Sequence, residues 1–154
     1  MSAKPFHPDA FDRKILNIVA GDGRIAVTEL ANQIGLSKTP CQLRLKKLEK
    51  EGYITGYRAM LDPVKLGLAH IAFVEVKLSD TRAGALDAFN AAVQPVGAIE
   101  QCHMIAGHFD YLLKVRTSDI ENYRKILGEI ISALPHVAQT STYVSMEAVK
   151  EVGV

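Results

Sequence analysis

A run of basic and polar residues between Ser37 and Lys50 has the composition of a surface that binds a polyanion. It holds five Lys or Arg side chains and a single acid, Glu49. Cations of this kind bind phosphates, and the amide and guanidinium groups among them can form paired hydrogen bonds with base edges. We predict that this segment contacts DNA through Ser37, Lys38, Thr39, Gln42, Arg44, Lys46 and Lys47.

The predicted roles divide by chemistry. Gln42 is expected to pair with adenine and Arg44 with guanine in the major groove. Lys46 and Lys47 are flexible point charges and are expected to hold phosphates, aided by hydroxyl groups and the helix dipole at the start of the segment. The simpler alternative is a solvated basic helix face, because runs of charge usually indicate only exposure.

The elements around this segment favour DNA binding. Apolar residues recur with helical spacing over about 9–22, 27–34 and 37–51. Asp9 and Ser37 are expected to cap the first and third helices, whereas Ala26 gives the second helix no capping side chain. A short helix, a tight turn at Gly35 and a further helix predict a helix-turn-helix, with residues 53–57 as an extended arm or wing.

The second half of the chain follows a different pattern. Alternating runs predict strands over 70–78, 99–106, 109–115 and 137–146, with helices marked by Leu86 to Val93 and by Ile120 to Leu134. Ser118 is the expected cap of the later helix. The order βαββαβ predicts an α+β, ferredoxin-like domain with its helices on one face. Ile71 and Phe73 would then lie on the other face, which favours contact with another protomer over open water.

These patterns predict three parts: residues 1–55 as the DNA-binding domain, 56–69 as a linker or strand, and 70–154 as the ferredoxin-like domain. The charge follows the same division. The first 58 residues carry a net +4 and the remainder a net −3. With 48% apolar and 23% charged residues, the composition is typical of a globular protein.

Several other classes of protein are disfavoured. The chain has no run long enough to span a membrane and no secretory signal, so we expect a cytoplasmic, nucleoid-associated protein. It has no nucleophile elbow, P-loop, dinucleotide fingerprint or HExxH motif, so we expect no enzyme and no cofactor. A metal site at Cys102, His103, His108 and Asp110 is a further alternative. It is disfavoured because adjacent strand residues point to opposite faces.

The N-terminal motifs resemble those of the Lrp/AsnC (leucine-responsive, feast/famine) family of transcriptional regulators. The matching stretches are 12–16, 23–25, 29–31, 35–37, 39–41, Arg44, 48–49, 52–54 and 56–57. Residues 107–112 resemble the family's G-x-x-D-Y turn. The resemblance covers about residues 9–150, and within the family it is strongest toward leucine-responsive and proline-utilisation regulators.

The resemblance implies a small amino-acid effector, leucine or proline-related, bound in the ferredoxin-like domain between neighbouring dimers. Carried over by position, the site would be lined by Met104, Gly107, His108, Asp110, Tyr111, Ile120, Val144 and Ser145. The glycine would let backbone N–H groups approach the effector carboxylate, and Asp110 would hold its ammonium group. The resemblance also implies homodimers that assemble further, often to octamers.

We therefore predict a sequence-specific regulator of amino-acid metabolism that responds to an amino acid. One alternative is an architectural nucleoid protein, which would bind DNA by charge and shape and ignore amino acids. A second alternative is an amino-acid-binding enzyme, which would ignore DNA. The missing catalytic motifs argue against the enzyme.

Overall fold

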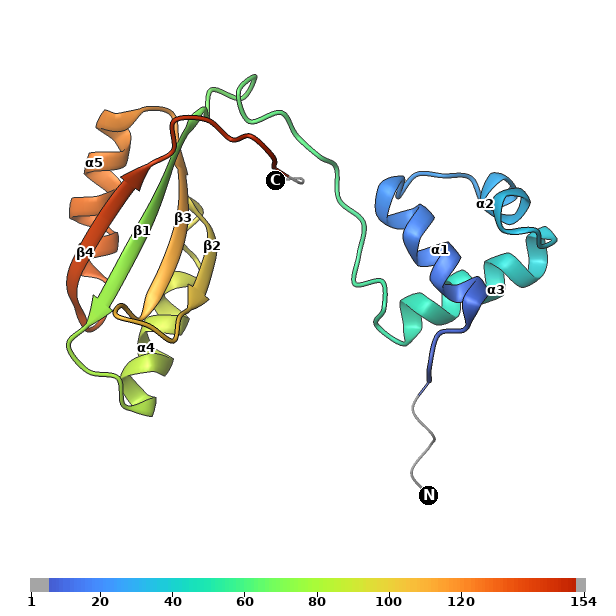
Figure 1. The fold of residues 1–154 in the computed structure, drawn as a ribbon, viewed down its shortest axis with the longest axis horizontal. Helices are drawn as coiled ribbons and strands as arrows, with labels where there is room; N and C mark the ends of the chain where they lie inside the picture. The colour runs from blue at the N-terminus through green and yellow to red at the C-terminus, as the bar shows by residue number, and fades with distance from the viewer. Residues whose placement is uncertain (1–5, 152–154) are drawn as a thin grey trace. The chain divides into compact units, whose positions relative to one another are not determined.

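The computed structural model describes residues 6–151, which divide into two units after Ala59. The first unit contains three helices, α1 (Ala10–Gly21), α2 (Val27–Ile34) and α3 (Lys38–Lys50) (Figure 1). The second contains β1 (His70–Leu78), α4 (Ala83–Val93), β2 (Ile99–Met104), β3 (Tyr111–Thr117), α5 (Ile120–Glu129), the short 3₁₀ helix η1 (Ile131–Ala133) and β4 (Val137–Val144). The predicted α+β architecture is confirmed.

Reciprocal hydrogen bonds define the start of α1. The Asp9 carboxylate accepts from the backbone N–H of Asp12, and the Asp12 carboxylate accepts from the backbone N–H of Asp9. This capping box satisfies two donors that the first turn leaves unpaired. Helix α2 has no such feature, because its N-cap is Ala26 and no side chain caps it. It ends at Gly35, whose φ of 75° lies in the left-handed region that glycine adopts at least cost.

A small core holds the three helices together. Its fully or nearly fully buried members are Ile15, Leu30, Ala31, Ile34, Cys41 and Leu48. They come from all three helices at the spacing that the sequence predicts. Cys41 and Leu48 occupy the inner side of α3, so the opposite side of that helix is left for solvent or a ligand.

One local prediction in this unit is wrong. The Ser37 side chain makes no capping bond to α3. A capping hydroxyl accepts from the second or third residue of a helix, and the third residue here is Pro40, which has no N–H. Residues 53–57, predicted as an extended arm, follow α3 as irregular backbone with no helix or strand.

Four strands form an antiparallel sheet in the order β2-β3-β1-β4. Figure 1 shows α4 and α5 on the same side of this sheet. The alternation in β1 is as predicted: Ala72, Val74, Val76 and Leu78 are buried in the main core, together with Phe89 of α4 and Tyr123 of α5. Such a one-sided sheet leaves its second face without helices.

We call this second side the open face of the sheet. The register places Phe73 of β1 between Lys114 of β3 and Tyr143 of β4. Glu75 lies in the neighbouring row, between Leu112 and Ser141. The open face thus mixes exposed aromatic rings with charged groups.

The boundaries of some elements differ from those predicted. Strands β2 and β4 end two residues early, and β3 covers Tyr111–Thr117 rather than 109–115, so the turn between β2 and β3 is a six-residue loop. Helix α5 is capped by Asp119, which accepts from the backbone N–H of Asn122, and not by Ser118. The Ser118 hydroxyl donates instead to the Asp119 carboxylate. In the described part of the chain, no helix has the length and apolar character that crossing a bilayer requires.

Candidate functional site

The outer side of α3 is exposed, as the DNA-binding prediction requires. Lys38, Thr39, Gln42, Lys46, Lys47 and Lys50 are all exposed, while Cys41 and Leu48 on the inner side are fully buried. Within residues 6–151, no hydrogen bond or ion pair occupies the amide of Gln42. The helix therefore presents polar and cationic groups that are free to meet a ligand. Lys47 is the exception to this freedom, because its Nζ lies 4.0 Å from the centre of the Phe6 ring.

Leu43 shares this outer side and was not predicted as a contact. Its side chain is 64% exposed although it is large and apolar. It follows Gln42 directly, and the helical repeat of 3.6 residues places it next to Lys46 and Lys47. Its exposure is compatible with apolar contact to a thymine methyl group. Its position on the polar side of the helical repeat was the available signal.

Arg44 is placed differently from the rest of the predicted set. Its side chain is only one-third exposed, and its Nη1 atom lies 2.6 Å from Asp9 Oδ2 and 2.8 Å from Asp12 Oδ1. The guanidinium also lies 5.5 Å from the centre of the Phe11 ring. The prediction that this side chain reads guanine therefore competes with two intramolecular ion pairs.

The hydrogen bonds and ion pairs of Asp9 and Arg44 shift the pKa values of these two residues. The pKa of Asp9 is lowered, first by the hydrogen bond from the Asp12 backbone and then by the one from Arg44. The pKa of Arg44 is raised by its bonds to Asp12 and Asp9. Both partners are therefore charged over the whole physiological range of pH.

The predicted effector residues form two groups at opposite ends of the sheet. Met104, Gly107, His108, Asp110 and Tyr111 lie at or near the loop between β2 and β3, beside the end of β1. Ile120, Val144 and Ser145 lie near the other end, where Val144 pairs with Ala72 and Ser145 donates to the Ile71 carbonyl. The stretch of β1 between Ala72 and Leu78 is roughly 20 Å long at the usual rise of a strand. One chain therefore does not bring the two groups together.

Two members of the first group already have structural partners. The Asp110 carboxylate accepts a hydrogen bond from the backbone N–H of Leu78 at 2.7 Å. Tyr111 is 1% exposed, and its hydroxyl donates to Asn90 Oδ1 at 2.9 Å. Burial in this position raises the pKa of Tyr111. Tyr111 therefore belongs to the core and does not line a surface site as predicted, whereas the second carboxylate oxygen of Asp110 has no hydrogen-bond partner among the described residues.

A hollow of about 170 Å³ lies beside the same loop, on the open face. It is lined by Glu75, Lys77, His108, Phe109, Gln139 and Ser141. Glu75 Oε2 lies 3.7 Å from His108 Nε2, and Lys77 donates to the His108 carbonyl at 3.1 Å. Only His108 among these residues was predicted. Four of the other five come from strands β1 and β4, which meet the loop only in the folded sheet.

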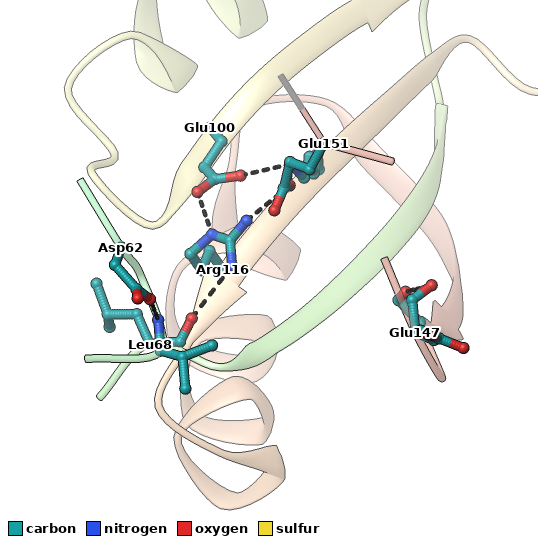
Figure 2. Close-up of polar contacts among 9 residues, drawn as sticks. Asp62, Leu68, Glu100, Arg116, Glu147 and Glu151 are labelled. Carbon is teal, nitrogen blue, oxygen red and sulfur yellow. Dashed lines mark hydrogen bonds and ion pairs between the residues drawn. The ribbon is translucent and has the colours of Figure 1, made fainter. Parts of the chain in front are cut away.

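A cluster of four charged residues holds the C-terminal segment to the open face. Arg116 of β3 donates to Glu100, to Glu151 at 2.7 Å and to the Leu68 carbonyl at 3.2 Å (Figure 2). Lys114 pairs with the same two glutamates. These bonds lower the pKa of Glu151. Arg116 therefore joins β2, the segment before β1 and the end of the described chain.

The alternative metal site is not assembled. Cys102 packs against the core, whereas His103 on the opposite side of β2 is exposed. Among the described residues, no group of three His, Cys, Asp or Glu side chains is arranged to hold a metal ion.

Comparison with known proteins matches each unit to a known domain. Residues 8–55 match a winged helix-turn-helix DNA-binding model, and residues 71–154 match the model of the Lrp/AsnC ligand binding domain. The chain is 62% identical over 146 residues to a proline dehydrogenase transcriptional activator of Rhizobium radiobacter, covering 95% of this chain and 94% of that one. The chain belongs to the Lrp/AsnC family of transcriptional regulators.

Two further Lrp/AsnC proteins extend the comparison. The leucine-responsive regulatory protein of Salmonella typhimurium is 48% identical over 143 residues, covering 93% of this chain and 87% of that one. The transcriptional regulator NMB0573 of Neisseria meningitidis, solved with L-Met, is 28% identical over 94% of both chains, with a TM-score of 0.88. Lrp/AsnC proteins are DNA-binding regulators rather than enzymes, and the chain combines the family's DNA-binding and amino-acid-binding domains.

Proposed function

We propose that this Lrp/AsnC regulator controls amino-acid catabolism, and specifically that it activates transcription of a proline dehydrogenase gene when proline binds. The identity of 62% to a relative named for that activity carries the proposal. The leucine-responsive relative is less similar, at 48%. Regulation by leucine is therefore the second candidate.

The proposed DNA contacts are the exposed residues of α3 and the residue before it. Gln42 reads a base edge, and Leu43 adds apolar contact with thymine. Ser37, Lys38, Thr39, Lys46 and Lys47 hold phosphates, which fix the position of the helix on the duplex. Residues 1–55 form the DNA-binding domain, 56–69 the linker, and 70–154 the domain that senses the effector and assembles.

The proposed effector site lies between two protomers. The loop group of one chain and the Ile120, Val144 and Ser145 group of another together form one pocket. The separation of these groups within a single chain supports this arrangement, because neither group alone encloses a ligand. The amino acid in the Neisseria relative supports the class of effector.

The proposed assembly is a homodimer that associates further, up to an octamer, in the cytoplasm on the nucleoid. A single α3 helix makes few base contacts, and a twofold dimer doubles them on two half-sites about one helical turn apart. The open face supports a protomer interface, because Phe73 and Tyr143 are large aromatic residues that remain 36% and 55% exposed. An effector between dimers shifts the assembly only by its different affinity for the two states.

A thermal-shift screen of the twenty amino acids, paired with light scattering, tests the effector and the assembly. We expect proline to raise the melting temperature and to change the particle size. Mobility shifts with the proline dehydrogenase promoter, with and without proline, test the target. Binding that falls steeply with salt, ignores sequence and ignores every amino acid would instead support the architectural alternative.

A further inference from the structure

We propose that Arg44 is a positioning residue that fastens the middle of α3 to the start of α1, and that it contacts neither base nor phosphate. This inference rests on the proposal that α3 is the helix that meets the DNA. It differs from the prediction of guanine readout, which considered Arg44 only as a member of the basic segment.

The hydrogen bonds around Arg44 account for all four carboxylate oxygens of its partners. Asp9 uses Oδ1 to accept from the Asp12 backbone and Oδ2 to accept from Arg44. Asp12 uses Oδ2 to accept from the Asp9 backbone and Oδ1 to accept from Arg44. The capping box of α1 and the ion pairs to α3 are therefore one connected network, and removing Arg44 leaves two of its acceptors without a donor.

Burial makes this network costly to open. Asp12 is only 4% exposed, and within residues 6–151 Arg44 is its one cationic partner. Leaving a buried carboxylate without its cation strongly destabilises the folded state. An Arg44 side chain that turned outward to reach DNA would leave Asp12 in that state.

The direction of Arg44 on its helix gives an independent argument. Residues two apart on an α-helix point about 200° away from each other. Arg44 therefore points away from Gln42 and Lys46, which are exposed and lie one turn apart on the outer side. Instead it borders the fully buried Cys41 and Leu48. Fixing this position sets the rotation of α3 about its axis, and thereby which side chains face the DNA.

Removal of a nearby carboxylate shows whether Arg44 contacts DNA or positions α3, because the two roles predict opposite changes in DNA affinity. Asp9 is half exposed, and asparagine caps a helix as well as aspartate does, so Asp9→Asn keeps the cap and removes one of the two ion pairs of Arg44. If Arg44 contacts DNA, this change weakens the intramolecular hold on Arg44 and removes a charge that repels DNA, so DNA binding strengthens. If Arg44 positions α3, binding weakens.

The experiment measures binding of the full chain to two labelled duplexes, one of random sequence and one obtained by in vitro selection with the wild-type chain. Variants are Asp9→Asn, Asp12→Asn, Arg44→Gln and the double variant Asp9→Asn/Arg44→Gln. Asp22→Asn is the control, because this exposed carboxylate at the other end of α1 bonds only the Arg24 backbone N–H within the described residues. Thermal unfolding of each variant separates weaker binding from loss of fold.

We expect Asp9→Asn and Arg44→Gln each to weaken binding to the selected duplex about tenfold. The double variant is expected to be no weaker than the weaker single variant, because both changes open one network. The salt dependence of binding should stay that of the wild type. Asp22→Asn should leave binding equal or slightly stronger.

Three results would overturn the inference: tighter binding by Asp9→Asn, unchanged binding by both aspartate variants, or a salt slope lowered by about one charge in Arg44→Gln. If the Asp12→Asn variant unfolds, the direction in which Asp9→Asn changes DNA affinity still tests the inference. A wild-type chain that binds both duplexes equally would overturn the proposed sequence specificity. The sign of Asp9→Asn on the random duplex would then still decide the role of Arg44.

Discussion

The carboxylate of Asp110 caps the end of β1 by accepting the backbone N–H of Leu78 at 2.7 Å. The Leu78 N–H lies on the same edge of β1 as the Val76 carbonyl, which accepts from the Asp110 backbone N–H. The pairing of β1 with β3 ends at Val76, so the Leu78 N–H has no backbone partner in that ladder. Asp110 therefore has a structural role in addition to the proposed contact with the effector.

Two substitutions separate these roles. Asp110→Ala leaves the Leu78 N–H without an acceptor and should destabilise the fold by about 1–3 kcal/mol. Asp110→Asn keeps an acceptor oxygen and should cost much less, but it removes the charge that would hold an ammonium group. We expect both variants to lose the amino-acid-dependent thermal shift. A full response in Asp110→Asn would remove this carboxylate from the effector site.

The outer side of α3 gives a second prediction. Gln42→Ala should weaken binding to a selected duplex by about 1–3 kcal/mol and change binding to random DNA little, because it removes a base contact. Lys46→Ala should weaken both equally and lower the salt slope by about one charge, because it removes a phosphate contact. Titrations of both duplexes at several salt concentrations measure this. Equal losses on both duplexes for Gln42→Ala would contradict the base-reading role.

The uncapped start of α2 gives a third prediction, which concerns stability. Ala26→Ser should stabilise the chain by ~1 kcal/mol, because a hydroxyl at this N-cap can accept a backbone N–H that now has no side-chain partner. Urea unfolding monitored by circular dichroism measures the change. Ala20→Ser is the matched control, since this exposed residue lies inside α1, where serine is slightly unfavourable. No gain in Ala26→Ser over this control would refute the capping argument.

Tyr57 gives a prediction about alkaline pH. Its hydroxyl donates to Glu49 Oε1 at 2.8 Å, and partial burial together with this bond raises the pKa of Tyr57 to about 12. The stabilisation from this neutral phenol is complete below pH 10, the ordinary tyrosine value, and is lost as the pH rises toward 12.

We therefore expect the melting temperature of Tyr57→Phe to fall less steeply than that of the wild type between pH 10 and 12. Tyr143→Phe serves as the control, because this ring lies exposed in the other unit. Parallel curves for wild type and Tyr57→Phe would show that the phenol does not contribute. Gly23 lies against the same ring, because a Cβ at this position would be 3.1 Å from Tyr57 Cδ1.

Local patterns predicted the helices and the sheet, because they depend on residues close in sequence. The apolar spacing of Ile15, Leu30 and Leu48 and the alternation in β1 correspond directly to buried positions. The ends of elements were less predictable. Asp119 replaced Ser118 as the cap of α5 because neighbouring residues with equivalent acceptors compete for the same N–H.

Contacts between distant residues were beyond the sequence patterns. The partners of Arg44 lie 32 and 35 positions away, and one of them, Asp9, already had a sufficient local explanation as the cap of the first helix. The hollow beside His108 depends on residues of β1 and β4, which only the strand register brings together. The effector residues were carried over by resemblance, and their separation within one chain emerged only from the fold.

The charged cluster around Arg116 has a consequence for self-association. Its two cations and two carboxylates offset one another inside a single chain. In a twofold complex, a patch near the axis faces its own copy, so any uncompensated charge would oppose an identical one. Replacing Glu151 with glutamine would remove one of the two carboxylates, leave excess positive charge on the open face, and make two such molecules repel.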